Sequence, residues 1–445
     1  MARQLFGTDG VRGRAGHFLT VELAVALARA AVSRIPGGDG RAQVLIIRDT
    51  RESGEMLESA IAAGVTAAGG DALLGGVLPT PAAPLLVRRH GLALAAVISA
   101  SHNPYEDNGI KLFAADGFKL DDDDEHAIED EMERPMAPPA NIGHVRRLHG
   151  ALEDYLRELH TRFADLDLTG RRVLLDCANG ATCRAAPEIF RRLGAEVDVL
   201  ADEPDGRNIN DGCGSTHLET ITARMLEGRH DVGFAFDGDG DRVLAVDREG
   251  AMVDGDELVA LAAIHLRGTG RLTGGGVAIT VMTNYGFHTA MHGAGVEVAT
   301  TAVGDRYVLD ELRKRGWALG GEQSGHIIDL GFGPSGDGIA SALLTLEALG
   351  ERDLSARDAM HKLPQRLVNI RAADRAALAV AMGHDDVIGA IEREGAALAD
   401  RGRVLVRPSG TEPLIRVMVE APSQEETDAV CERLRTAVET VLAAP

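Results

Sequence analysis

Three stretches of the chain share one arrangement of apolar and polar positions. In residues 44–54, 173–181 and 277–286, an apolar run rich in β-branched residues ends in a polar turn, and a helical pattern follows. Continuous apolar runs of this length predict strands buried on both faces of a parallel sheet. Alternation with helices is typical of α/β units. The copies lie roughly 105–130 residues apart, which predicts one α/β domain repeated three times.

The pattern changes near residue 367. From there, shorter strand and helix patterns alternate to the end of the chain, which predicts a compact α+β domain of about 80 residues. A charged helical pattern at residues 145–163 predicts a link between the first two domains. We therefore expect four domains, with α/β domains at residues 1–155, 156–253 and 254–366 and the α+β domain at residues 367–445.

Charge and cysteine usage restrict the class of protein. The 445 residues include 46 basic and 68 acidic side chains, for a formal net charge of -22. Such a surface repels phosphate backbones, which argues against nucleic acid as a partner. Any site for a small phosphorylated ligand must therefore be a local basic pocket. The four cysteines form no C-x-x-C pair and fit reduced thiols. The N-terminal residues show no apolar stretch of the kind found in signal peptides, and no apolar run is long enough to span a bilayer. We therefore expect a cytoplasmic protein that does not bind membranes.

A candidate nucleophile lies in the segment S-A-S-H-N-P at residues 99–104, which follows an apolar run at 92–98. Ligands of parallel sheets bind where strands end, and this places Ser101 in a loop that Pro104 closes. A free serine is a weak nucleophile and needs an activating group. His102 or Lys111 could move the proton. By residue types alone, the segment could equally be an ordinary Asn-Pro turn.

A candidate metal site lies at residues 237–242, D-G-D-G-D-R, after another apolar run. Asp237, Asp239 and Asp241 alternate with glycines that let the backbone curl, so their carboxylates can converge. Oxygen-only ligands favour a hard cation such as Mg²⁺, and without a cation the crowded carboxylates would repel one another. A calcium EF-hand loop needs Gly at its sixth position and Glu at its twelfth, where this chain has Arg242 and Arg248. The segment therefore predicts a magnesium site.

A third motif, G-E-Q-S-G-H at residues 321–326, has sugar-binding character. Glu322 and Ser324 lie two residues apart, so in an extended loop their side chains face the same way. A carboxylate beside a hydroxyl suits two neighbouring sugar hydroxyls. Alone, the segment could be a surface turn.

The fourth motif, R-P-S-G-T-E-P-L-I-R at residues 407–416, has the composition of a phosphate cradle. Arg407 offers a fork of donors, and Gly410 exposes backbone N–H groups. Ser409 and Thr411 add hydroxyls. The motif supplies the local positive charge that the acidic surface lacks, although alone it could be a proline-bounded loop.

The four motifs fall in four different predicted domains, at or near strand ends. A serine nucleophile, a metal, a sugar grip and a phosphate cradle together describe phosphoryl transfer on a sugar. Two other classes stay open. A metal-dependent serine phosphohydrolase would release inorganic phosphate, but it usually needs a denser set of His and Asp ligands than lies near Ser101. A non-enzymatic metal- or sugar-binding protein would not carry phosphate on Ser101.

With these motifs in this order, the chain resembles the α-D-phosphohexomutases over essentially its full length. It more closely resembles the bacterial members that act on glucosamine phosphates, in the segments FGTDGVRG, SASHNP, NIN with CGSTH, and TAVGDRYV at residues 6–13, 99–104, 208–217 and 301–308. The resemblance implies four domains around a central cleft, the first three sharing an α/β fold. It also makes a homodimer a reasonable expectation.

The resemblance further implies roles for individual residues. Ser101 would carry the phosphoryl group, and one Mg²⁺ per active site would be bound by a phosphate oxygen on Ser101 together with Asp237, Asp239 and Asp241. Glu322 and Ser324 would bind the sugar O3 and O4. The non-reacting phosphate would be held by Arg407, Ser409, Gly410, Thr411 and Arg416. The cleft would be lined by Arg12, Lys111, Arg242 and His326, with Lys111 or His102 as general acid or base.

The implied substrate is a small phosphosugar. Phosphate would move between O6 and O1 of glucosamine, for the synthesis of UDP-N-acetylglucosamine and peptidoglycan precursors. Because one phosphoserine must serve both positions, the sugar would bind in two orientations, with a hexosamine 1,6-bisphosphate as intermediate or activator. Phosphoglucomutase or phosphomannomutase activity is the alternative within the family. Ser101 could first be phosphorylated by autophosphorylation, by a kinase or by the bisphosphate.

Overall fold

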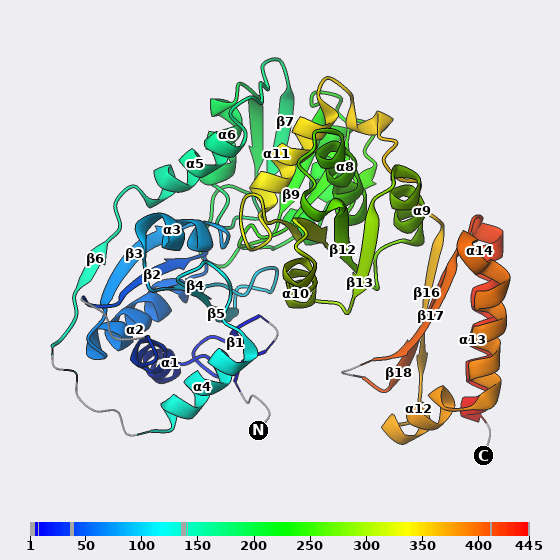
Figure 1. Ribbon diagram of the computed structural model, residues 1–445, viewed down its shortest axis with the longest axis horizontal. Helices are drawn as coiled ribbons and strands as arrows, with labels where there is room; N and C mark the ends of the chain where they lie inside the picture. Colours follow the sequence, from blue (N-terminus) through cyan, green and yellow to red (C-terminus); the bar gives the residue numbers. More distant parts are fainter. Residues whose placement is uncertain are drawn as a thin grey trace. The chain divides into compact units, whose positions relative to one another are not determined.

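The computed structural model describes residues 5–7, 9–35, 40–134, 139, 141–409 and 412–443 (Figure 1). Its strands form four sheets. The chain divides into two compact units, residues 1–281 with 296–357 and residues 282–295 with 358–445. The first unit contains three sheets, and the second contains the fourth sheet and helix α9 (Tyr285–Ala294). Within the described ranges, none of the helices has the length and apolar composition that a membrane span requires.

The first module is a six-stranded sheet in the order β1-β5-β4-β2-β3-β6. Strand β2 pairs in parallel with β3 and β4, and β5 pairs antiparallel with β4 and β1. Val44 and Ile46 of β2 share a core with α1 and α2. Leu45 and Ile47, which point to the other face, are also fully buried, so the predicted strand buried on both faces is confirmed. The strands are β1 (Val11–Arg14), β2 (Gln43–Arg48), β3 (Asp71–Val77), β4 (Leu94–Ile98), β5 (Asp107–Ala114) and β6 (Val145–Arg147). The helices are α1 (Val21–Ser33), α2 (Gly54–Ala67), α3 (Ala82–His90) and α4 (Asp122–Met132).

The second module repeats this arrangement around β7, which pairs in parallel with β8 and β9. Its five strands have the order β11-β10-β9-β7-β8. They are β7 (Arg172–Asp176), β8 (Glu196–Leu200), β9 (Val232–Phe236), β10 (Val243–Asp247) and β11 (Met252–Val253). The helices are α5 (Ala151–Arg162), α6 (Ala185–Arg192), the short η1 (Gly214–Thr216) and α7 (Glu219–Met225).

The third sheet is built around β12, which pairs in parallel with β13 and β14. Its order is β13-β12-β14-β15, and its strands are β12 (Gly276–Thr280), β13 (Glu297–Thr301), β14 (Leu319–Gly321) and β15 (Ile327–Asp329). Its helical segments are α8 (Gly255–Gly268), η2 (Thr273–Gly275), α10 (Asp305–Arg315), α11 (Gly338–Leu349) and η3 (Leu354–Ala356). The three apolar runs singled out in the sequence are thus the strands β2, β7 and β12.

The C-terminal module is smaller, as predicted. Its antiparallel sheet has the order β16-β18-β17, and helix α14 packs against β16 and β18. The strands are β16 (Gln365–Arg371), β17 (Arg403–Pro408) and β18 (Leu414–Glu420). The helices are α12 (Arg375–Met382), α13 (Asp385–Leu398), the short η4 (Ala399–Arg401) and α14 (Gln424–Ala443).

The prediction of one helical segment over residues 145–163 is wrong at its start. Val145–Arg147 pair in parallel with β3 as the edge strand β6, and helix α5 begins only at Ala151. Gly150, which precedes the helix, has a left-handed backbone that ends the preceding segment. A three-residue edge strand of exposed residues has no local signature, because its pairing partner lies about 70 residues away.

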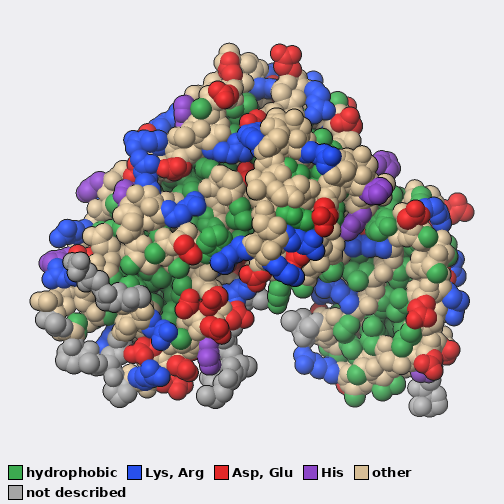
Figure 2. Space-filling model, in the orientation of Figure 1, with side chains coloured by type: hydrophobic (Ala, Val, Ile, Leu, Met, Phe, Trp, Pro, Cys, Tyr) green, Lys and Arg blue, Asp and Glu red, His purple; other side chains and the backbone are tan. Residues whose placement is uncertain are grey.

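The candidate motifs of the first three modules follow strands. The serine segment follows β4, the aspartate segment follows β9, and the Glu322 segment follows β14. In open α/β sheets, ligands bind outside the carboxyl ends of the strands. On the face shown in Figure 2, basic side chains lie among acidic ones, so the net charge of -22 does not form one uniform acidic surface.

A buried carboxyl group should make the stability of the third module depend on pH. Asp337 caps α11 and accepts a hydrogen bond from Tyr155, and burial raises its pKa to about 6. Because the folded pKa exceeds the unfolded one, this contribution to stability is present below pH 4 and is lost as the pH rises through 6. Relative to the wild type, Asp337→Asn should therefore gain about 2 kcal/mol in the free energy of unfolding between pH 4.5 and 7.5.

Denaturant unfolding followed by the fluorescence of Trp317, the only tryptophan, would measure this gain. Asp310→Asn, on the exposed side of α10, is the matched control and should leave the pH dependence unchanged. A constant difference between the wild type and Asp337→Asn over this range would contradict the assignment.

Candidate active site

Ser101 lies at the carboxyl end of β4, at the start of the loop that leads to β5. The residue is fully buried. Its Oγ donates to Asp237 Oδ2 at 2.6 Å and lies 3.2 Å from His102 Nδ1. The backbone of Ser101 is left-handed, with φ at 54°, a region that few residues other than glycine adopt. The fold thus brings the predicted nucleophile to the predicted metal loop, 136 positions further along the chain.

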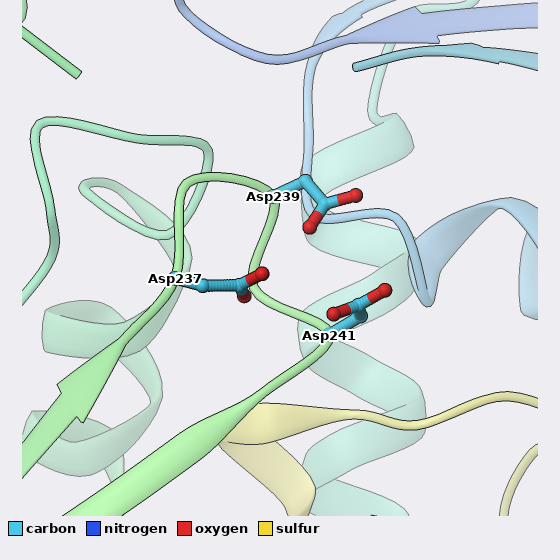
Figure 3. A group of neighbouring side chains, drawn as sticks. All are labelled: Asp237, Asp239 and Asp241. Carbon is cyan, nitrogen blue, oxygen red and sulfur yellow. The ribbon is translucent and has the colours of Figure 1, made fainter. Parts of the chain in front are cut away.

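Asp237, Asp239 and Asp241 lie in the loop between β9 and β10 and are all buried. Their carboxylates gather on one side of this loop, and one oxygen of each lies within 4.8 Å of the others (Figure 3). Within the described residues, Asp239 Oδ1 and Asp241 Oδ1 are buried without a hydrogen-bond partner. Such atoms are rare in folded proteins, and a set of carboxylate oxygens suits a hard cation. These residues therefore fit Mg²⁺.

The carboxylates repel one another, and the surrounding cations only partly offset this. Burial and the charges of Asp241 and Asp239 raise the pKa of Asp237 well above its usual value. Lys111 Nζ lies 2.9 Å from Asp239 Oδ2 and 3.5 Å from Asp241 Oδ2. Burial lowers the pKa of Lys111, but the carboxylates of Asp239, Asp9 and Asp241 outweigh burial and raise it. Lys111 therefore stays charged beside the cluster.

Arg242 and His326 lie on the other side of Asp241. Arg242 Nε is 3.7 Å and His326 Nδ1 is 3.6 Å from Asp241 Oδ1. Burial raises the pKa of Asp241, but Lys111, His326 and Arg242 together hold it well below its usual value. Burial and the charges of Arg242 and Arg12 lower the pKa of His102, which favours a neutral imidazole beside Ser101.

A series of partly buried charges, not predicted from the sequence, continues from Lys111. Asp9 lies 3.0 Å from Lys111 Nζ and also binds Arg12 and Lys119. Lys119 in turn binds Asp305, at the start of α10. Asp9 and Asp305 lie in FGTDGVRG and TAVGDRYV, two of the segments that carry the resemblance to the bacterial family members. The presence of Asp9 and Asp305 in these two segments was the only sequence signal for the charge series. Their contacts with Lys111 and Lys119 appear only in the folded protein.

The Glu322 segment is not the extended loop that was predicted. Residues 322–325 form a turn closed by a hydrogen bond from Gly325 N to Glu322 O at 3.0 Å. Glu322 is buried and accepts from Gly304 N at 3.0 Å, whereas Ser324 is exposed. Gly325 has φ at +88°, and a Cβ there would lie 2.1 Å from the carbonyl oxygen of Val243. The turn thus fixes this loop against the strand that follows the aspartates.

The phosphate-cradle segment lies in the second compact unit, where β17 and β18 pair. Arg407 and Arg416 stand directly opposite each other across this pair. Like charges in such positions repel, so the pair suits a bound anion. Ser409 N donates to Leu414 O at 2.8 Å, and Ser409 Oγ accepts from Glu412 N at 3.3 Å. The predicted contacts Gly410 and Thr411 lie outside the described residues.

Four family models match the chain. They are the phosphoglucomutase/phosphomannomutase alpha/beta/alpha domains I, II and III, at residues 3–138, 153–250 and 254–367, and the C-terminal domain of the same family, at residues 367–437. The chain belongs to the α-D-phosphohexomutase family. The resemblance inferred from the motifs is therefore confirmed. So is the predicted fold class, three α/β domains and a smaller C-terminal domain.

Several phosphohexomutase relatives are similar over nearly the whole chain. A phosphoglucosamine mutase from Moorella thermoacetica is 48% identical over 437 residues, which cover 96% of this chain and 97% of the relative. A phosphoglucosamine mutase from Rhodococcus jostii is 47% identical, with 98% of this chain and 100% of the relative covered.

Two solved phosphohexomutase structures have the same fold. A phosphoglucomutase/phosphomannomutase family protein from Burkholderia thailandensis has a TM-score of 0.83 at 23% identity, with 99% of this chain and 98% of that chain covered. The N-acetylphosphoglucosamine mutase of Aspergillus fumigatus, solved with GlcNAc-6P and magnesium, has a TM-score of 0.66 at 18% identity and covers 99% of this chain and 96% of its own. At these identities the likeness concerns the fold.

Proposed function

We propose that this phosphohexomutase interconverts glucosamine 6-phosphate and glucosamine 1-phosphate through a phosphoserine at Ser101. One observation carries the proposal. Ser101 Oγ lies 2.6 Å from Asp237 Oδ2, at the edge of three buried carboxylates, two of which have an oxygen with no hydrogen-bond partner among the residues that the structure describes. The choice of glucosamine is supported by the relatives named above, which are phosphoglucosamine mutases.

Phosphoryl transfer depends on charge neutralisation and in-line positioning. Asp237, Asp239 and Asp241, with a phosphate oxygen on Ser101, would hold Mg²⁺, which draws charge from the transferring group. Lys111 lies within 4 Å of Asp239 and Asp241, and Arg242 and His326 lie within 4 Å of Asp241, so all three add positive charge there. His102, neutral beside Ser101 Oγ, is the candidate base for the proton of the attacking hydroxyl, and Lys111, which stays charged, is the candidate acid for the leaving oxygen.

The sugar would be held at its middle and at its far phosphate. We assign Glu322 and Ser324 to O3 and O4, which move least when the sugar turns over. The non-reacting phosphate would be bound by Arg407, Ser409, Gly410, Thr411 and Arg416. Because the same Ser101 serves O1 and O6, glucosamine 1,6-bisphosphate would form between the two transfers. We assign Arg12 to the cleft beside the substrate, an assignment supported by its ion pair with Asp9 and by the charges of Asp239 and Asp241 that act on it.

The product would supply UDP-N-acetylglucosamine and peptidoglycan precursors, which are made in the cytoplasm. The four cysteines, which are free thiols, fit that reducing compartment. The homodimer and the four domain ranges given above are part of the proposal.

The substrate claim is tested by kcat/KM for the 6-phosphates of glucosamine, glucose and mannose, with Mg²⁺ and a trace of the matching bisphosphate. We expect a preference of at least about a hundredfold for the amino sugar, which is about 2.7 kcal/mol of discrimination. Equal or better use of glucose or mannose phosphate would overturn the substrate and keep the mutase. Inorganic phosphate released without a sugar 1-phosphate would instead favour the phosphohydrolase.

A further inference from the structure

Arg51 is buried beneath the loop that carries Ser101. It lies three residues beyond the end of β2, and its side chain is 0% exposed. Each N–H hydrogen of its guanidinium has an acceptor. The acceptors are Asp49 Oδ2 and the carbonyl oxygens of Ser101, Asn103, Pro104 and Asp107. One charged side chain therefore holds four carbonyl groups of a single loop.

Asn210 of the second module binds the same loop. Its Nδ2 donates to Ser101 O at 3.0 Å and to Asn103 O at 3.1 Å. Ser99 adds a third link, because its Oγ donates to Asp49 Oδ2 at 2.6 Å and accepts from Ser101 N at 2.9 Å. Both backbone polar groups of Ser101 are thus bound by this set, which we call the serine clasp and define as Asp49, Arg51, Ser99 and Asn210.

The clasp holds a backbone conformation that serine alone disfavours. A left-handed φ of 54° persists only where the surrounding structure over-determines it. The metal loop adds a further constraint, because a Cβ on Gly238 would lie 2.7 Å from Ser101 O and 2.8 Å from Asn210 Nδ2. The Ser101 carbonyl is therefore fixed by Arg51, Asn210 and Gly238. Rotation of this backbone would swing Oγ away from Asp237.

Neighbouring bonds fix the two modules to each other at the same point. Thr50 Oγ1 donates to Asn179 O at 2.6 Å, and Glu52 N donates to Gly206 O at 2.9 Å. In the segment 49–52, Asp49 and Arg51 thus contact the serine loop, whereas Thr50 and Glu52 contact the second module. Because Ser101 comes from the first module and Asp237 from the second, this segment helps to align the two.

We infer that Arg51 and Asn210 are positioning residues for phosphoryl transfer, which hold the Ser101 backbone so that Oγ faces the aspartate cluster. The inference rests on the proposed role of Ser101. Neither residue is placed to touch the substrate, and each acts through the carbonyl groups of residues 101 and 103.

Arg51→Lys and Asn210→Ala test this inference. A lysine ammonium has three donors and cannot span four carbonyls, so we expect kcat to fall by about a hundredfold, as for a displacement of roughly 1 Å at a reacting group. Asn210→Ala leaves Arg51 in place and should lower kcat by about tenfold. KM for the sugar phosphate should change less than about threefold in both, because the ground-state contacts are untouched.

Two readouts separate positioning from a loss of folded protein. The first is kcat per phosphorylated molecule, with phosphoserine at Ser101 counted by intact mass. A purely structural role would lower the yield of folded enzyme but leave this ratio unchanged. The second is the kcat of Arg51→Ala with added ethylguanidinium, which should restore part of the lost kcat, whereas ethylammonium should not. Arg207→Gln is the matched control, because Arg207 binds Glu52 at the same module boundary but is 66% exposed. It should keep the wild-type kcat.

The assays use whichever sugar phosphate the wild type turns over best. A preference for another sugar would therefore overturn the substrate claim. The role of the clasp would still be tested by kcat per phosphorylated molecule with that sugar. A kcat within twofold of the wild type in Asn210→Ala and Arg51→Lys would overturn the inference, as would a rise in KM with kcat unchanged. If the Arg51 variants do not fold, the kcat of Asn210→Ala alone decides whether the inference stands.

Discussion

Replacing Ser101 by alanine should lower mutase turnover by at least about a thousandfold, because the transferred group loses its only covalent carrier. The alanine removes Oγ, which donates to Asp237 Oδ2. The neighbouring hydroxyl of Ser99 cannot replace it, since that group is engaged with Asp49 and with the Ser101 backbone. The fold should persist, because the clasp binds backbone groups that alanine keeps. The assay is formation of the 1-phosphate from the 6-phosphate with Mg²⁺ and bisphosphate.

Intact mass after incubation with the bisphosphate supplies a second, independent readout. The wild type should gain one phosphoryl group, and Ser101→Ala should gain none. Ser59→Ala is the matched control, because this serine is on α2 and its Oγ donates to the helix backbone at Glu55 O. It should behave as the wild type. Ser101→Ala with a tenth or more of wild-type turnover would rule out a phosphoserine mechanism.

The sequence predicted the elements whose signal is local. The apolar runs at 44–47, 173–175 and 277–279 became the centres of interior strands, because only apolar residues fill them on either face. The alternation of aspartate and glycine at 237–241 likewise predicted a curled acidic loop. That Ser101 would meet this loop followed from two weaker arguments, the position of both segments after strands and the resemblance to a family.

What could not be predicted depends on contacts between distant segments. In the sequence, Arg51 is an ordinary charged residue in a turn. It becomes a buried member of the serine clasp only because residues 101–107 pack over it in the folded protein. Asp9, Lys119 and Asp305 are likewise isolated charges whose pairing joins three remote segments. The error at Glu322 had a different cause. Spacing by two implies a common face only in an extended chain, and the glycine at 325 allows a turn instead.

Asp239→Asn should remove most of the Mg²⁺ dependence of this enzyme along with its activity. Asp239 Oδ2 accepts from Thr80 Oγ1 at 2.6 Å and from Lys111 Nζ at 2.9 Å. An asparagine must keep its oxygen at that position to satisfy both donors. Its NH₂ group then occupies the place of Oδ1, the buried oxygen without a partner, and points a donor at the cation. We expect Mg²⁺ affinity to fall at least about tenfold and kcat about a hundredfold or more.

Thermal unfolding with and without Mg²⁺ checks the same assignment without any turnover. Burial and the charges of Asp241 and Asp239 raise the pKa of Asp237, so removing one charge relieves part of the repulsion in the metal-free protein. Added Mg²⁺ should raise the melting temperature of the wild type but hardly that of Asp239→Asn, since a ligand stabilises only a protein that binds it. Asp198→Asn, a 65% exposed carboxylate of the same module that pairs with His230, is the control and should respond to Mg²⁺ as the wild type does. Equal Mg²⁺ affinity in the wild type and Asp239→Asn would show that the cation is held elsewhere, whatever the effect on kcat.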